Sequence, residues 1–217
     1  MREQFIYAVA RIRAKELSLL SAQDVSRLMS CETFEECINI LRDKGWGSET
    51  VDVADYQALL KIEEAKLWQL ISELVPDKSL FNVVLLPTDF HNLKAAVKGY
   101  ITESLSENLF IPGGNADISH LTRCIEERNF SDLPAYMAES AKLAFEKLLH
   151  TGDGQLCDNI IDKALLEAII GEGNRSKSAL IRDYAEFYVA SSNIKITVRS
   201  LILKKNMNFL NLMKVFP

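Results

Sequence analysis

Apolar residues recur every three or four positions along most of the chain, which is the spacing of amphipathic α-helices. Helices are expected at Tyr56–Leu74, Ile118–Glu127, Leu133–Leu149 and Leu156–Ile170. In the last segment, apolar and small residues alternate at spacings of three and four over about six turns: Leu180, Tyr184, Phe187, Ser191, Ile194, Val198 and Leu201. This pattern predicts a long final helix with one packing seam.

Capping residues indicate where the early helices begin and end. Ser21–Asp24 is typical of a turn followed by a helix start, and Thr33 with Glu36 three positions later matches a capping box. Gly45 is expected to end the helix that Thr33 begins, because glycine tolerates the left-handed conformation found after a helix C-terminus.

One stretch is ambiguous between helix and strand. Val83–Leu86 is apolar throughout, which allows a short strand, but its neighbours are helical, so a helix or the approach to one is expected. A helix should restart at Pro87–Asp89. Pro112–Asn115 is the clearest internal linker, and Gly171–Asn174 is expected to form another turn. No other segment alternates as a strand does, so the predicted fold class is all-α.

A short pattern occurs twice, about a hundred residues apart. His91–Lys98 and Ser192–Arg199 share an Asn, an aliphatic residue, a Lys, two variable positions, a Val and a base. Asp24–Leu28 also resembles Asp117–Leu121, although chance similarity between amphipathic helices explains that second match more simply. The repeat predicts two similar multi-helix modules with long antiparallel helices, 1–113 and 114–217.

Composition and charge exclude some classes of protein. The 217 residues are 48% hydrophobic and carry a net charge of −5, whereas nucleic-acid-binding proteins usually have a basic face. No secretory signal is visible, and no apolar run approaches the roughly 20 residues that span a bilayer. The sequence therefore predicts a cytoplasmic or peripheral protein that binds no nucleic acid.

The cysteines and histidines show no metal-type spacing. Cys31 and Cys37 are not spaced as in a zinc knuckle, and His91, His120 and His150 are scattered. The four cysteines are expected to be reduced core thiols, and no metal site is predicted. No Gly-rich loop has the Walker spacing, and no cofactor is expected.

Asp89, His91 and Asn92 allow two interpretations. A carboxylate and an imidazole can act as base and orienting group, which would suit a small helical hydrolase. The structural interpretation is favoured, because no nucleophile or third acid completes a site. In it, Thr88 or Asp89 caps a helix start and Asn92 satisfies a buried contact.

Four basic residues fall at i and i+4 in the two copies of the repeat: Lys94, Lys98, Lys195 and Arg199. A solvated helix face is the simpler interpretation. The functional alternative is contact with acidic groups of a partner, where such charges set the rate and orientation of docking.

Four short motifs carry a family resemblance: Tyr7–Ala14, Gly45-Trp46-Gly47, Asp89–Lys94, and Asn193-Ile194-Lys195 followed by Arg199. Their order and spacing resemble the C subunit (the d subunit in eukaryotes) of V-type and archaeal-type rotary ATPases. Two departures exist. Ser191-Ser192 precede the second Asn where an acidic residue is expected, and a third helical module of the family is expected to be absent from this chain.

The resemblance implies a non-catalytic coupling subunit of an H⁺- or Na⁺-transporting ATPase or ATP synthase. Such a subunit lies on the cytoplasmic face of the membrane, links the central stalk to the proteolipid ring and transmits rotation between them. Eight residues are expected to serve interaction or module packing: Asp89, His91, Asn92, Lys94, Lys98, Asn193, Lys195 and Arg199. A helical scaffold of another complex is the main alternative.

Overall fold

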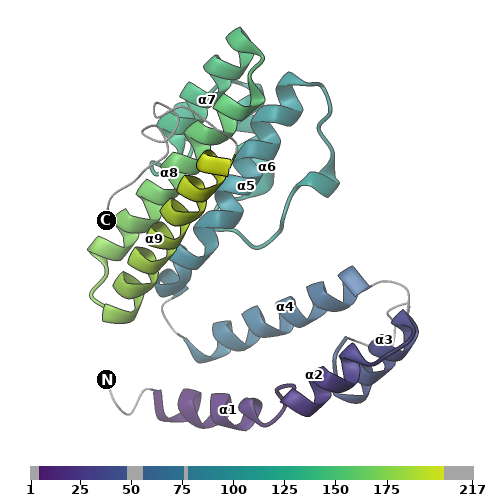
Figure 1. Cartoon of the computed structure of the whole chain (residues 1–217). Helices are drawn as coiled ribbons and strands as arrows, with labels where there is room; N and C mark the ends of the chain where they lie inside the picture. Colours follow the sequence, from purple (N-terminus) through teal and green to yellow (C-terminus); the bar gives the residue numbers. More distant parts are fainter. Residues whose placement is uncertain (1–4, 48–55, 76–77, 203–217) are drawn as a thin grey trace. The chain divides into compact units, whose positions relative to one another are not determined.

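The computed structural model describes residues 5–47, 56–75 and 78–202 (Figure 1). These ranges contain nine α-helices, a few short 3₁₀ helices and no strand, which confirms the all-α fold class. The chain divides into two compact units, 1–78 and 79–217, and each is described by itself. The predicted module boundary at 113 and 114 lies inside the second unit, so the two repeated modules stay a prediction.

The first unit holds four helices: α1 (Ile6–Glu16), α2 (Ala22–Met29), α3 (Phe34–Asp43) and α4 (Tyr56–Leu74). The predicted start of α2 is confirmed, since Ser21 and Asp24 form a reciprocal capping box with N–H···O distances of 3.2 and 2.9 Å. At α3 only half of the predicted box forms. Thr33 accepts the N–H of Glu36, but the Glu36 carboxylate accepts the N–H of Glu32 instead.

The Gly45-Trp46-Gly47 turn follows the end of α3. Both glycines have positive φ, 85° and 76°, a conformation that favours residues without a Cβ. The N–H of Gly47 donates to Glu63 at 2.8 Å, and Lys66 donates to the carbonyl of Gly47 at 2.8 Å. The turn is thus fastened to α4 by two oppositely charged side chains.

The second unit is a bundle of five helices: α5 (Asn82–Ile101), α6 (Ile118–Glu126), α7 (Ala138–Thr151), α8 (Gly154–Arg175) and α9 (Ala179–Ile202). The 3₁₀ helix η2 (Lys78–Phe81) precedes α5, η3 (Glu107–Leu109) lies between α5 and α6, and η4 (Phe130–Asp132) lies between α6 and α7. Helix α8 packs against α5, α7 and α9, while α5 also packs against α6 and α7. Buried residues of these helices form one continuous core, with Phe90, Leu93, Ile161 and Ile169 among its fully buried members.

Short connections make neighbouring helices of the second unit antiparallel. Gly152 ends α7 with a left-handed φ of 66°, and Asp153 caps α8 by accepting the N–H groups of Gln155 and Leu156. Three residues, 176–178, then separate α8 from α9 (Figure 1).

Three expectations about helix limits are wrong. Helix α5 runs without a break through Pro87, which costs one backbone hydrogen bond near its start but does not begin a new helix. Helix α7 begins at Ala138 rather than at Leu133. Gly171–Asn174 is helical instead of a turn, and Gly173 has a packing reason: a Cβ there would lie 2.5 Å from the Cβ of Ala185 on α9.

The final helix extends as predicted, but of its expected seam only Tyr184 and Ser191 are half-buried, and Tyr184 packs against the core. Leu180 and Phe187 are each 75% exposed, and Ile194, Val198 and Leu201 are also exposed. The opposite face, with Ala185 and Val189, enters the core instead. Ala185 on this face is small, and so is Gly173 opposite it on α8, which lets the two helices approach closely.

None of the helices in the described ranges is both long and apolar enough to cross a bilayer.

Candidate functional site

Asp89 and Asn92, three residues apart on α5, are fully buried and fasten the connection that follows the helix. The two oxygens of the Asp89 carboxylate accept three hydrogen bonds: from the N–H of Ala116 at 2.9 Å, the amide of Asn115 at 2.9 Å and the hydroxyl of Tyr136 at 2.8 Å. The Asn92 amide makes a two-way pair with the backbone of Ile111, both bonds being 2.8 Å long.

The neighbouring residues are adapted to this polar network. Gly114 lies so close to the Asp89 carboxylate that a side chain at that position would collide with it. Burial, followed by the charge of Asp89, raises the pKa of Tyr136 well above its ordinary value. The phenol is therefore held in its protonated form, in which it donates to Asp89.

His91 completes the attachment of the connection, but from the exposed face of α5. Its Nε2 lies 3.1 Å from the carbonyl oxygen of Leu109. Residues two apart on a helix do not face each other, and Asp89 is buried whereas His91 is exposed. The base-and-orienter pair that a hydrolase would need is therefore not assembled. Asp89, His91 and Asn92 act together as a clamp on residues 109–116, which we call the loop clamp.

The two lysines of the first repeat copy pair within the chain. Lys94 pairs with Asp162, and Lys98 donates to Asp158 at 2.7 Å. The second pair lies four residues further along α5 and four residues back along α8, as expected for antiparallel helices. Lys94 and Lys98 thus have acidic partners on α8 within the second unit, and a contact with another molecule stays a prediction for them.

The second copy of the pattern lies in a different environment. Asn193 is half-buried on α9, while Lys195 and Arg199 are exposed and form no ion pair with any residue in the described ranges.

The two cysteines of the second unit are core residues, as expected. Cys124 and Cys157 are buried. Burial, assisted by the nearby Asp158, raises the pKa of Cys157 to about 11, so it is a neutral thiol at physiological pH rather than a nucleophile.

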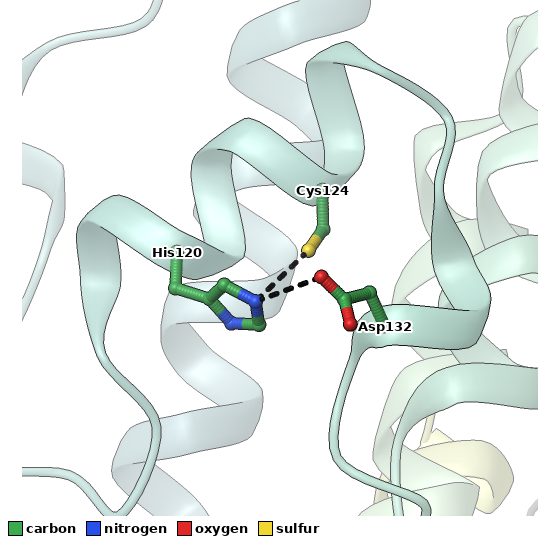
Figure 2. A group of neighbouring side chains, drawn as sticks. All are labelled: His120, Cys124 and Asp132. Carbon is green, nitrogen blue, oxygen red and sulfur yellow. Dashed lines mark hydrogen bonds and ion pairs between the residues drawn. The ribbon is translucent and has the colours of Figure 1, made fainter.

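One group of potential ligands was missed by the sequence analysis. His120 and Cys124 are four residues apart on α6, and Asp132 of η4 lies beside them (Figure 2). The Nε2 of His120 is 3.2 Å from Oδ2 of Asp132 and 3.6 Å from Sγ of Cys124. The signal in the sequence was the i, i+4 spacing of His and Cys on a predicted helix.

The similarity of the chain to known proteins shows its family. The sequence model of the ATP synthase (C/AC39) subunit family matches residues 8–215. The chain is 22% identical to the C subunit of the V-type sodium ATPase of Enterococcus hirae, over 92% of this chain and 61% of that protein. It is 24% identical to the C subunit of the A-type ATP synthase of Methanothermobacter thermautotrophicus, over 90% of this chain and 54% of that protein. The chain thus spans less than two thirds of both relatives. No solved structure gives a significant match.

Proposed function

The chain belongs to the ATP synthase (C/AC39) subunit family, and from this membership we propose that it is a non-catalytic coupling subunit of an H⁺- or Na⁺-transporting rotary ATPase or ATP synthase. In this role it links the central-stalk subunits to the membrane proteolipid ring, on the cytoplasmic side, and transmits rotation between them. The family match over residues 8–215 carries the proposal, because it includes almost every helix of the chain.

The packing of the second unit suits a part that transmits force. Close-packed protein interiors have low compressibility and pass strain on to their neighbours. The continuous core is reinforced by the loop clamp and by the pairs that Lys94 and Lys98 form with α8. These contacts fix the register of α5 against α8 and fasten the connection between α5 and α6.

Exposed apolar residues support a role inside an assembly. Large exposed apolar patches on a soluble protein usually mark surfaces that meet another molecule. The outer side of α9 presents Leu180, Phe187, Ile194, Val198 and Leu201. Lys195 and Arg199, on the same helix, are our candidates for contact with acidic groups of the stalk or ring, where they would steer docking.

The experiment is affinity purification of the tagged protein from detergent-solubilised membranes of its source organism, with mass analysis of everything retained. Central-stalk and proteolipid subunits are expected to co-purify. Recovery of the chain without any rotary ATPase component would contradict the proposal and favour a scaffold of another complex.

A charge-reversal pair tests the candidate contact residues in the same purification. Lys195→Glu with Arg199→Glu should reduce recovery of the partners, and the loss should be largest at low salt, where exposed charges are screened least. The matched control is Lys142→Glu with Lys147→Glu, two exposed bases of α7, which should leave recovery unchanged. Equal recovery from both double variants would remove Lys195 and Arg199 from the interface.

A further inference from the structure

The three side chains His120, Cys124 and Asp132 converge at one edge of the second unit. His120 and Cys124 project from the same face of α6, and Asp132 reaches them from η4 (Figure 2). One donor atom from each residue lies within 4.8 Å of the other two. We propose that these three residues bind a zinc ion.

The distances between the donor atoms match those of a tetrahedral zinc site. Zinc bonds of about 2.0–2.1 Å to nitrogen, 2.3 Å to sulfur and 2.0–2.2 Å to oxygen place N and S about 3.6 Å apart, and N and O about 3.3 Å apart. The observed separations are 3.6 Å between Nε2 and Sγ and 3.2 Å between Nε2 and Oδ2. Two of the three separations therefore already fit a zinc ion, and the third, between Sγ and the Asp132 carboxylate, is within 4.8 Å.

Hydrogen bonding alone satisfies this arrangement poorly. A ring nitrogen of neutral histidine carries either one hydrogen or one lone pair, yet Nε2 of His120 faces both the thiol of Cys124 and the carboxylate of Asp132. Nε2 can therefore form a good hydrogen bond with only one of these groups at a time. A cation at the centre would be bound by all three groups at once.

The backbone holds the third ligand in place. Arg128 has a left-handed φ of 55°, and the N–H of Asn129 donates to the carbonyl of Cys124 at 2.9 Å, so the chain reverses directly after α6. The Arg128 guanidinium also lies 5.4 Å from the centre of the Phe145 ring on α7. This anchored turn brings Asp132 back beside α6.

The ligand types select the metal. Imidazole and thiolate favour zinc over magnesium or calcium, which prefer oxygen ligands. The thiol proton of Cys124 leaves to solvent as the zinc–sulfur bond forms. Cys124 is buried, whereas the Asp132 side chain is 60% exposed, so the ion enters from the Asp132 side and a water completes its coordination. The bound ion would tie α6 to the turn that leads into α7.

The test uses the full chain without a polyhistidine tag, stripped with a chelator and titrated with Co²⁺ and then with Zn²⁺. One equivalent of Co²⁺ should give thiolate charge-transfer and tetrahedral visible bands, and Zn²⁺ should abolish them. One equivalent of Zn²⁺ should also raise the melting temperature, because a ligand that binds only the folded state stabilises it.

Matched variants assign the signal to these residues. His120→Asn, Cys124→Ser and the exposed Asp132→Asn should each weaken metal binding by more than about tenfold. The controls His150→Asn and Asp183→Asn, at exposed positions, should bind like the unchanged protein. Far-UV circular dichroism confirms that each variant is folded, and Asp132→Asn keeps the test valid if the buried Cys124→Ser does not fold.

Cys31 and Cys37 in the first unit are the competing thiols. The double variant Cys31→Ser, Cys37→Ser should retain the site in full. Absence of metal binding at micromolar concentration would overturn the proposal. So would binding that persists in His120→Asn or that disappears with Cys31 and Cys37.

Discussion

The two compact units bury apolar surface very differently. In the second unit, residues from all five helices share one continuous core. In the described part of the first unit only five apolar residues are buried, and they are spread over α1, α3 and α4: Ala8, Ile38, Ile40, Leu59 and Leu74. Leu17 and Met29 of that unit are 89% and 83% exposed. The described part of the first unit therefore has no core comparable to that of the second.

The two units also differ in where their polar contacts lie. The second unit has polar contacts as well, but Asp89 and Asn92 are buried and act on top of a complete core. In the first unit, the Arg11–Glu73 ion pair is exposed to water, which weakens such an interaction, and the Lys44–Asp24 pair is partly exposed through Lys44. A small unit with little apolar burial is marginal by itself, so the first unit is expected to be the less stable of the two.

The largest expected effect is a separation of the two unfolding transitions. Both tryptophans, Trp46 and Trp68, lie in the first unit, so their fluorescence reports on that unit alone, whereas far-UV circular dichroism reports on all helices. In urea, the fluorescence change should be complete before most of the helical signal is lost. Coincident transitions would show that the second unit is no more stable than the first.

The loop clamp should provide the next largest effect. Asp89→Ala leaves Asn115, Ala116 and Tyr136 without their buried acceptor and should lower the free energy of unfolding by about 3 kcal/mol or more. Asp183→Ala, an exposed control on α9, should change it by less than about 0.5 kcal/mol. The loss should be confined to the circular dichroism transition. Equal changes in the free energy of unfolding for the two variants would show that the loop clamp does not stabilise the fold.

Replacing two glycines of α8 with Ala should change the stability of the second unit in opposite directions. Gly173→Ala places a methyl group against Ala185 and should destabilise the second unit by about 1–3 kcal/mol. At Gly171 a Cβ meets only the end of the flexible Arg175 side chain, so Gly171→Ala should stabilise the unit by about 0.5–1 kcal/mol. Urea unfolding followed by circular dichroism measures both. Stabilisation by both substitutions would disprove the close approach of α8 and α9.

The smallest expected effect is on the stability of the first unit at acidic pH. The hydrogen bonds from Lys44 and then Ser21 lower the pKa of the Asp24 carboxyl below its usual value of about 4. The stabilisation is therefore present above about pH 4 and is lost as the pH falls further. Asp24→Asn should reduce the shift of the tryptophan transition between pH 6 and pH 3, whereas the exposed control Asp43→Asn should shift like the unchanged protein. If both variants lose the same acid sensitivity, Asp24 is not its source.

Local signals in the sequence predicted much of this fold. Helical periodicity placed most of the helices, and the residues Ser21, Thr33 and Gly45 marked helix ends because capping depends on only a few neighbouring residues. Gly171–Asn174 was predicted as a turn because the need for Gly173 comes from α9, a separate helix.

The site was harder to predict because its contacts join distant segments. The sequence singled out Asp89, His91 and Asn92, but not the loop they hold, since their partners lie 18–27 residues further along the chain. It could not show that Asp158 and Asp162 take the charges of Lys98 and Lys94. The exposed stripe of α9 shows a further limit, because periodicity reveals an apolar face without saying what covers it.

The coupling role is tested most directly by comparing ATP hydrolysis with ion transport in membrane vesicles from cells that lack this protein. A coupling role predicts that the catalytic subunits still hydrolyse ATP while ATP-driven ion uptake is lost, and that the unchanged chain restores uptake. Full ion uptake in its absence, or loss of both activities in proportion with the complex still assembled, would contradict a coupling function.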